Sequence, residues 1–307
     1  MTSTFVGMGC GCNFLFEVGS GGALCGGAAD VYCTGVTMEG GIVCGGASAY
    51  VDVVDEPFDG LCGCWHLQEL GSGAANEYQD SSPKGLHGQG GDGTASMVPT
   101  REDAVFCLQS QAFDGSDDFI QFPPDDIGNQ SFSVSLWTKL EGFYKQASWF
   151  ARGHDTTSGD KWVFNFSHSV MNHLMARYNL TDGTSFTQFI GASRHVLQVN
   201  RWFHIAVNFD RDQGRSITFI NGSADYTNDT TSTDALVSLT NDGFMGKSPQ
   251  SGFFFSTGLE GLNGNMLEVR LFPEAKDEVW FKAEYDNWCD PNFVLIGEEE
   301  SVTAPIY

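Results

Sequence analysis

Basic residues are scarce in this chain of 307 residues, which has 15 Lys and Arg against 39 Asp and Glu and a formal net charge of −24. No basic residue precedes Lys84. A protein that binds nucleic acid needs a basic face to neutralise phosphates, and docking on an anionic membrane also needs basic residues. The charge therefore argues against both classes, and we expect no nucleic-acid partner.

Long apolar runs are missing as well. No stretch approaches the roughly 18 consecutive apolar residues of a membrane-spanning helix, so we expect no membrane insertion. The N-terminal residues have neither the positive charge nor the apolar core of a Sec-type signal. Hydrophobic residues nevertheless make up 41% of the chain, which is enough to bury a substantial core.

Several catalytic motifs are absent. The chain contains no Gly-x-Ser-x-Gly nucleophile turn, no His-Glu-x-x-His zinc motif and no phosphate-binding loop. These absences remove the reaction classes that depend on those motifs, and we expect the chain not to be an enzyme.

Glycine and cysteine gather at the N-terminal end. Residues 1–60 hold five of the nine cysteines, and segment 21–29 (Gly-Gly-Ala-Leu-Cys-Gly-Gly-Ala-Ala) is echoed 19 residues later at 40–48. Short runs of β-forming residues lie near the glycine clusters, at 14–18, 31–33 and 49–54. This pattern predicts a small β-repeat module that completes its core against another subunit or domain. A flexible glycine-rich arm is the alternative.

From residue 61 the pattern becomes one of many short strands. They are expected near 62–68, 104–113, 118–122, 131–140, 147–152, 161–167, 172–179, 185–191, 202–209, 215–220, 243–246 and 264–272. Turn pairs such as Asn221-Gly222 separate them, and one helix is expected near 274–286. We predict an all-β, antiparallel two-sheet sandwich over residues 61–290, followed by an acidic C-terminal tail at 291–307.

Seven short sequence segments follow one another in a characteristic order within this region. They are residues 65–69, 80–88, 112–120, 132–137, 201–209, 217–222 and 262–272. Together they resemble the concanavalin A-like, laminin-G/pentraxin-type jelly-roll domain. The resemblance implies that fold, whereas function does not follow, because this sandwich carries binding modules, enzymes and structural parts alike.

These segments also have residue patterns that predict strands and turns directly. In the segment at 202–209, alternate residues Phe203, Ile205, Val207 and Phe209 should face one layer of the sandwich. Asn221-Gly222 should supply the positive φ angles of a two-residue hairpin turn, and we expect the same of Asp114-Gly115 between two strands.

Some enzymes of the jelly-roll family carry a Glu-x-Asp-x-x-Glu strand, which places two carboxylates for glycoside cleavage. That spacing does not occur here, and the acidic residues cluster in turns instead. The resemblance therefore favours binding over hydrolysis.

Members of the family often hold a structural Ca²⁺ with oxygens from the opening strand, the Asp-Ser-Ser loop and the closing strand. The matching positions are Glu69, Asp80 and Glu268, and carboxylate oxygens are the ligands that Ca²⁺ prefers. The resemblance thus implies a structural calcium site. In the alternative, Asp80 caps a turn and Glu268 pairs with Arg270 or a lysine.

The cysteines allow several interpretations. Cys10 and Cys12, with Cys62 and Cys64, form two Cys-x-Cys pairs that could supply four thiolates to a zinc or iron–sulfur site. Zinc is the weaker metal candidate, because its usual Cys-x₂-Cys spacing is absent. Disulfides between these two pairs, or burial as small apolar side chains, are the competing interpretations.

Four further cysteines offer disulfides of their own. Cys25 would join Cys44 if the repeats stack, and Cys107 would join Cys289 if the first and last strands of the sandwich meet. Because nine is odd, at least one thiol stays free or pairs between chains.

A ligand site should lie on rim loops or on the concave face, where aromatic platforms stand beside planar polar groups. The candidates are Trp149, Arg152, Asp155 and Trp162. Phe254 joins them, because three consecutive Phe residues cannot all face one core layer.

The glycine-cysteine repeats ahead of a lectin-like domain resemble modules of phage-type virion proteins. We therefore expect a structural virion protein, a capsid-decoration or tail-associated subunit located on the virion. Residues 1–60 would anchor it in a homo-oligomer and to other virion proteins, while the sandwich would adhere to host-surface glycans. An extracellular or cell-surface prokaryotic adhesin or filament subunit is the alternative, and a glycan-processing enzyme is third.

Overall fold

The computed structural model describes residues 61–124, 130–142, 147–152, 164–168, 173–181, 186–229, 242–247 and 261–290. For residues 1–60 it describes the backbones of four strands: β1 (Ser3–Gly9), β2 (Cys12–Val18), β3 (Ala23–Cys25) and β4 (Ile42–Cys44). The chain divides into two compact units, one of Pro57–Ala283 and one that combines Met1–Glu56 with Glu284–Tyr307.

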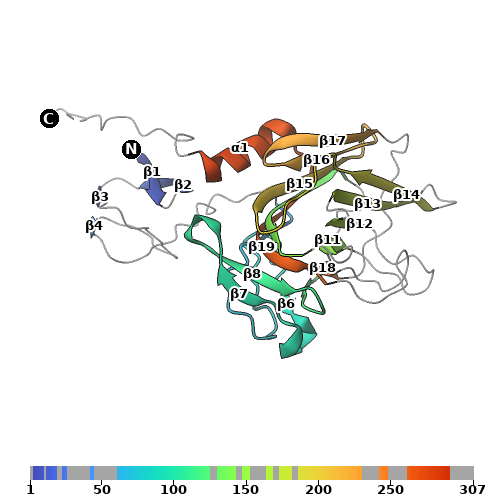
Figure 1. Ribbon diagram of the computed structural model, residues 1–307. Helices are drawn as coiled ribbons and strands as arrows, with labels where there is room; N and C mark the ends of the chain where they lie inside the picture. The colour runs from blue at the N-terminus through green and yellow to red at the C-terminus, as the bar shows by residue number, and fades with distance from the viewer. Residues whose placement is uncertain are drawn as a thin grey trace. The chain divides into compact units, whose positions relative to one another are not determined.

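One sheet of the sandwich has eight strands among the described residues. They are β5 (Gly63–Trp65), β7 (Thr100–Asp103), β8 (Gln109–Asp114), β10 (Phe132–Leu140), β15 (Trp202–Asp210), β16 (Arg215–Ile220), β17 (Ser223–Asp229) and β19 (Asn263–Phe272). Their order is β17-β16-β15-β10-β19-β8-β7, and β5 pairs with the C-terminal half of β19. Figure 1 labels β7, β8, β15, β16, β17 and β19 of this sheet.

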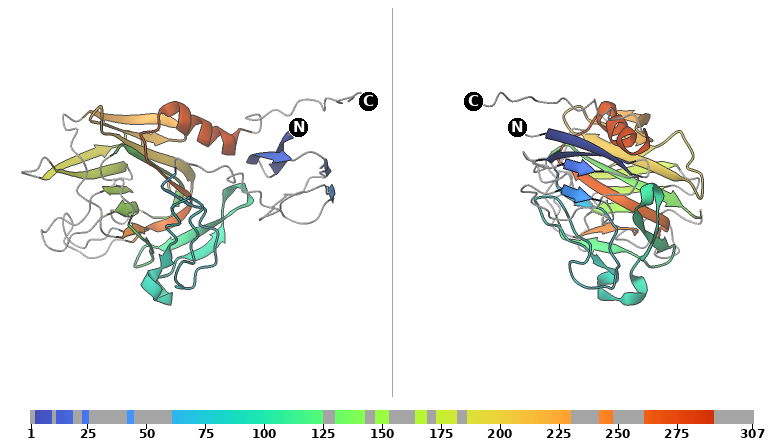
Figure 2. Two further views of the ribbon diagram at one scale, coloured as in Figure 1. Left: turned by 180° about the vertical axis from the view of Figure 1, so that it is seen from behind. Right: turned by 90° about the vertical axis from the view of Figure 1, so that its left-hand side faces the viewer.

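The second sheet has seven strands among the described residues. They are β6 (Gln89–Gly90), β9 (Ile120–Phe122), β11 (Ser148–Arg152), β12 (Phe164–His168), β13 (Leu174–Thr181), β14 (Phe186–Ala192) and β18 (Gly243–Met245). Their order is β14-β13-β12-β11-β18-β9-β6, with antiparallel pairing in both sheets. The two sheets face each other (Figure 2), which confirms the predicted jelly-roll sandwich.

The helical segments are few in the described part. Three short 3₁₀ helices occupy Gly91–Gly93, Ala95–Met97 and Val105–Cys107, and one α-helix, α1, spans Glu278–Cys289. No described helix is both long enough and apolar enough to cross a membrane.

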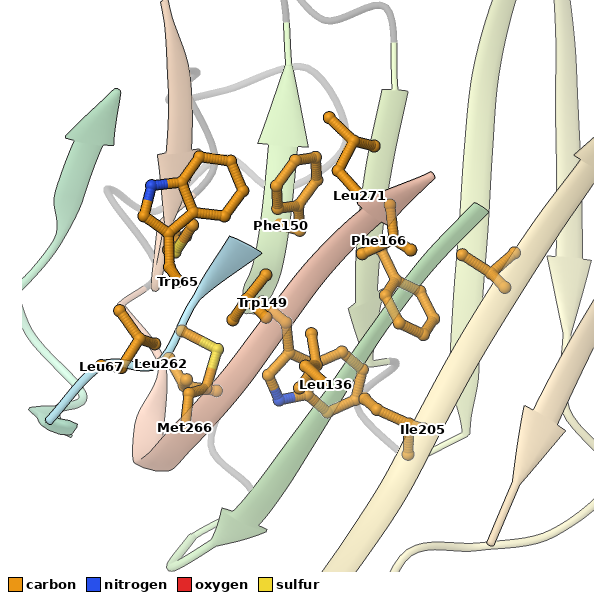
Figure 3. Packing of buried hydrophobic residues seen from close by; sticks show 14 of the residues in the cluster. Trp65, Leu67, Leu136, Trp149, Phe150, Phe166, Ile205, Leu262, Met266 and Leu271 are labelled. Carbon is orange, nitrogen blue, oxygen red and sulfur yellow. The ribbon is translucent and has the colours of Figure 1, made fainter. Parts of the chain in front are cut away.

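The core lies between the sheets and follows the expected alternation. Phe203, Ile205, Val207 and Phe209 of β15 all belong to the inner cluster, which also contains the fully buried Trp65 (Figure 3). Burying a side chain of this size contributes about 1.5–3 kcal/mol each. The apolar side chains of alternate β15 residues therefore fix this strand's register against the opposite sheet.

The outer face of β15 is covered by α1. Phe281 of the helix packs with Ala206, Phe219 and Phe272, and its ring centroid lies 4.6 Å from that of Phe219. The helix begins at Glu278 and not at residue 274, because Asp277 Oδ1 accepts the N–H of Trp280 at 2.9 Å and so caps the first turn.

Two turn predictions have different outcomes. Asn221 and Gly222 have φ angles of 50° and 77° and join β16 to β17, as expected for a two-residue hairpin turn. The hairpin expected at Asp114-Gly115 is wrong, because β8 and β9 belong to different sheets. Gly115 alone has positive φ there, and the chain crosses between the two layers.

Three described strands of the sandwich, β6, β7 and β17, were not predicted, and one strand begins later than predicted. Strand β17 is rich in Asp, Asn and Ser, which are poor strand formers, and it lies at the edge of its sheet. The strand expected from residue 104 begins at Gln109, because Phe106 and Cys107 have φ angles of 60° and 58° and cannot continue a strand.

The N-terminal strands form two pairs. Strands β1 and β2 are antiparallel, whereas β3 and β4 are parallel, with Ala23 opposite Ile42 and Cys25 opposite Cys44. This register has the same offset as the sequence repeat, so the echoed segments lie side by side. The expected strands at 31–33 and 49–54 and the tail at 291–307 lie outside the described residues.

Candidate functional site

A hollow of about 320 Å³ lies at one end of the eight-stranded sheet. Its walls are the loop 195–201, the start of β15, the end of β16, and the first residues of β17. The hairpin turn at Asn221 places β16 and β17 together at this end, and the loop that leads into β15 closes the other side. This volume falls at the lower end of the range of about 300–1,000 Å³ for small-molecule sites.

Asp225 fixes the loop that forms one wall. Its carboxylate accepts the backbone N–H groups of Arg194 and His195, and it also contacts His195 Nδ1. The Asp225 side chain is 2% exposed, whereas that of His195 is 79% exposed. The carboxylate is therefore occupied by the protein, and the imidazole stands at the surface beside the hollow.

The remaining polar groups point to hydrogen bonding with a ligand. Asn221 Oδ1 accepts the His204 N–H at 3.1 Å, and no contact of the described residues uses Asn221 Nδ2. Arg201 Nη1 makes a long hydrogen bond of 3.5 Å to Gln198 Oε1, and its guanidinium carbon lies 5.5 Å from the centre of the Phe203 ring. The Asn221 amide and the Arg201 guanidinium therefore line one side of the hollow, and each has N–H donors that a ligand could use.

Apolar side chains complete the walls. Val196, Leu197, Phe203 and Ile220 line the hollow, and Val196 is 53% exposed. The arrangement combines an apolar surface with a few planar polar groups, which is the usual composition of a small-molecule site.

These residues were not predicted from the sequence, although a signal was present. Residues 183–209 contain no Asp or Glu, in a chain with 39 acidic residues, and they include Arg194, His195 and Arg201. A long acid-free stretch in so acidic a chain marks a surface with a different electrostatic character.

Two predicted ligand residues need correction. Trp149 and Arg152 of β11 are both 0% exposed. Trp149 Nε1 donates to Thr138 Oγ1 at 2.9 Å in the core, and Arg152 lies with its guanidinium carbon 5.5 Å from the centre of the Phe122 ring. Neither side chain reaches solvent, so neither is a surface platform. Asp155, Trp162 and Phe254 lie outside the described residues.

We expect Trp149→Phe to lower the free energy of unfolding by about 1–2 kcal/mol, because it removes a buried hydrogen bond and part of a packed ring. Binding of any ligand should not change. Urea unfolding and a binding assay on the same sample check this result. If the variant lost binding but kept its stability, Trp149 would be a ligand-binding residue after all.

The three expected calcium ligands are each in contact with groups of the protein. Asp80 is 5% exposed, and its two oxygens accept hydrogen bonds from Cys64 N, Ser82 N, Ser82 Oγ and Leu86 N. Glu69 Oε1 accepts the Gln79 N–H at 3.0 Å, and Glu268 is in contact with His66 and Arg270. These contacts match the alternative of a turn cap and an ion pair.

Glu268 lies at a bulge in β19. Its φ angle is 54°, and the pairing with β10 shifts between Ser135 and Trp137 at this point. The bulge aims the carboxylate at His66 Nδ1, 2.8 Å away, and at Arg270 Nη2, 3.1 Å away. Burial alone would raise the pKa of Glu268, but the charges and hydrogen bonds of His66 and Arg270 outweigh it and lower that pKa.

A different set of carboxylates does come together in the described residues. The carboxylate oxygens of Asp114, Asp117 and Asp118 lie within 4.8 Å of one another. Burial, together with the charges of Asp114 and Asp117, raises the pKa of Asp118 to about 6, although the Asp114 N–H that it accepts opposes the shift. A raised pKa means that the folded protein holds this proton more tightly than the unfolded chain does.

The raised pKa of Asp118 makes its contribution to stability depend on pH. The favourable contribution of Asp118 is present below its unfolded pKa, near 3.8, and is lost as the pH rises through about 6. We therefore expect Asp118→Asn to raise the melting temperature at pH 7.5 and to change it little at pH 4.5. The exposed Asp212→Asn is the matched control, and melting in chelator at both pH values is the measurement. An equal effect of Asp118→Asn at the two pH values would contradict the assignment.

The cysteines of the sandwich divide into three situations. Cys62 and Cys64 are buried thiols within the hydrophobic clusters, which matches the interpretation of burial as small apolar side chains. Cys107 is in a disulfide, whereas Cys289 is an exposed free thiol, so the expected Cys107–Cys289 pair is wrong. The side chains of Cys10, Cys12, Cys25 and Cys44 are outside the described part.

Comparison with known proteins places the chain by family and by fold. Residues 114–279, more than half of the chain, match the family described as the concanavalin A-like lectin/glucanases superfamily. No curated protein sequence matches the chain.

Solved structures share the fold at low sequence identity. The binding domain of Paraclostridial Mosquitocidal Protein 1 is 11% identical with a TM-score of 0.52, and the match covers 75% of this chain and 52% of that one. The ligand-binding domain of botulinum neurotoxin serotype D, in complex with N-acetylneuraminic acid, is 12% identical with a TM-score of 0.51, covering 74% and 51%. Trypanosoma rangeli sialidase is 13% identical with a TM-score of 0.50, covering 76% and 33%. The match thus spans about half or less of the length of these proteins, and the likeness is one of fold.

Proposed function

Because this chain belongs to the concanavalin A-like lectin/glucanases superfamily, we propose that its sandwich binds carbohydrate in the hollow beside β15, β16 and β17, without cleaving it. The observation that carries the proposal is the composition of that hollow. The amide of Asn221 and the guanidinium of Arg201 can bond hydroxyl groups, while Val196 offers apolar surface to the C–H face of a sugar ring. The ligand-binding domain of botulinum neurotoxin serotype D, about half of which shares this fold, was solved in complex with N-acetylneuraminic acid, which supports testing sugars as ligands.

The wider role that we propose is that of a structural virion protein, a capsid-decoration or tail-associated subunit that presents this domain to host-surface glycans. The repeat strands β3 and β4 support it, since they pair in the register of the sequence repeat. Stacked units of this kind bury little by themselves and generally need neighbours. Self-association through residues 1–60 would supply them.

A glycan array probed with the full-length chain tests the binding function. We expect retention of a defined subset of glycans and no release of shorter sugars during long incubation. Absence of binding at high protein concentration would contradict the proposal, and turnover of a bound polysaccharide would replace binding with hydrolysis.

Native mass spectrometry of the full-length chain, with and without reductant, tests the assembly role separately. A stable homo-oligomer is the expected result. A well-folded monomer under both conditions would contradict self-association while leaving the glycan-binding function intact.

A further inference from the structure

The hollow differs in charge from the rest of the chain. The chain has a formal net charge of −24, yet residues 183–209 contain no acidic residue, and this stretch supplies the loop 195–201 that forms one wall. Asp225 is the acidic residue in the described lining of the hollow, and Glu278 contacts the lining residue Ala224. Asp225 is occupied by the N–H groups of Arg194 and His195, and Glu278 accepts the Ala224 N–H at 2.9 Å. Both carboxylates therefore have their oxygens directed at protein N–H groups.

Arg201 is the cation in the wall of the hollow. Phe203 supports its guanidinium from below at 5.5 Å, and its long contact with Gln198 engages only one of five N–H donors. A guanidinium in this state can bond a carboxylate with two parallel hydrogen bonds. Arg194, by contrast, lies over the Tyr226 ring at 5.9 Å and does not line the hollow.

From these charges we propose that the hollow takes a saccharide bearing a carboxylate, with Arg201 as the residue that binds the anion. The apolar wall of Val196, Phe203 and Ile220 would contact the apolar face or an acetyl methyl of the same sugar. This inference rests on the proposed carbohydrate-binding function and narrows it from any glycan to acidic ones.

The experiment compares acidic saccharides with neutral counterparts of the same shape. The probes are 3′-sialyllactose against its methyl ester, and galacturonate oligomers against their methyl esters, titrated into the full-length chain. We expect at least one acidic probe to bind, and its neutral counterpart to bind at least tenfold more weakly. We expect Arg201→Gln to weaken binding of the acidic probe tenfold or more.

Arg194→Gln is the matched control, because it removes the same charge from the same loop but outside the hollow. It should change affinity less than twofold. Equal losses in the two variants would overturn the assignment of Arg201, since they would indicate general attraction to the loop. Thermal melting confirms that both variants, which change exposed side chains, remain folded.

The two proposals fail in distinguishable ways. If neutral and acidic members of a pair bind equally, the acidic specificity is overturned and the carbohydrate-binding function stands. If the array and all four probes show no binding, the proposed function itself is overturned, and this inference with it.

Discussion

Gly264→Ala is expected to destabilise the sandwich by about 4 kcal/mol or more, which is a large part of the 5–15 kcal/mol that holds a typical protein folded. Gly264 lies in β19 opposite Leu140 of β10, with a φ angle of 150°. A Cβ atom there would be 2.2 Å from the Lys139 carbonyl oxygen and 2.9 Å from Leu140 Cα. Both are backbone atoms of a central strand, so they cannot give way without breaking the ladder.

Urea unfolding, followed by tryptophan fluorescence, measures this effect. The control is Gly85→Ala, where φ is 63° and the nearest atom to a new Cβ is His87 Nε2 at 3.8 Å. That change should cost about 1–2 kcal/mol, the penalty of left-handed backbone alone. Similar midpoints for the two variants would show that β10 and β19 are not packed as described.

Glu268→Ala has the second-largest expected effect, about 3 kcal/mol, because it leaves His66 and Arg270 beside an empty, buried position. The Glu268 side chain is 2% exposed, and those of His66 and Arg270 are 15% and 22% exposed. Glu268→Gln keeps the shape and loses only the charge, so it should cost less. Asp229→Asn, in the exposed pair with Arg215, should cost under about 1 kcal/mol.

The pH dependence separates the ionic part of this effect. Because the folded pKa of Glu268 is lowered, its contribution is present above its unfolded pKa, near 4.5, and is lost as the pH falls through the folded value. The difference between wild type and Glu268→Gln should therefore be larger at pH 7 than at pH 3. A difference of the same size at both values would mean that shape, not charge, is what Glu268 supplies.

Much of the sandwich could be predicted because its strands carry local signals. The alternation of Phe203, Ile205, Val207 and Phe209 marks β15 and its inner face without any knowledge of the partner strand. Strand β17 carries no such signal, since an edge strand needs neither apolar alternation nor good strand formers. The sequence therefore predicts strands that build the core better than strands that border it.

The candidate site was far less predictable, because its residues come together only through the fold. Asp225 holds a loop that lies 30 residues earlier in the chain, and no spacing rule anticipates that contact. Trp149 and Arg152 were predicted at the surface because of their residue types. Arginine is almost never fully buried, so an aromatic-arginine pair in sequence resembles a surface platform, but here both side chains lie in the core.

The pairing of β5 with β19 has a consequence for how the protein is made. His66 and Glu268 are in contact across 202 residues of chain, so the ribosome finishes the first side of this pair long before it makes the second. At about 5–20 residues per second, the interval is roughly 10–40 seconds. During that time the side chains of Trp65 and Leu67 have no closing strand to cover them. The nascent chain must stay soluble with part of its core open, and its folding should be slow.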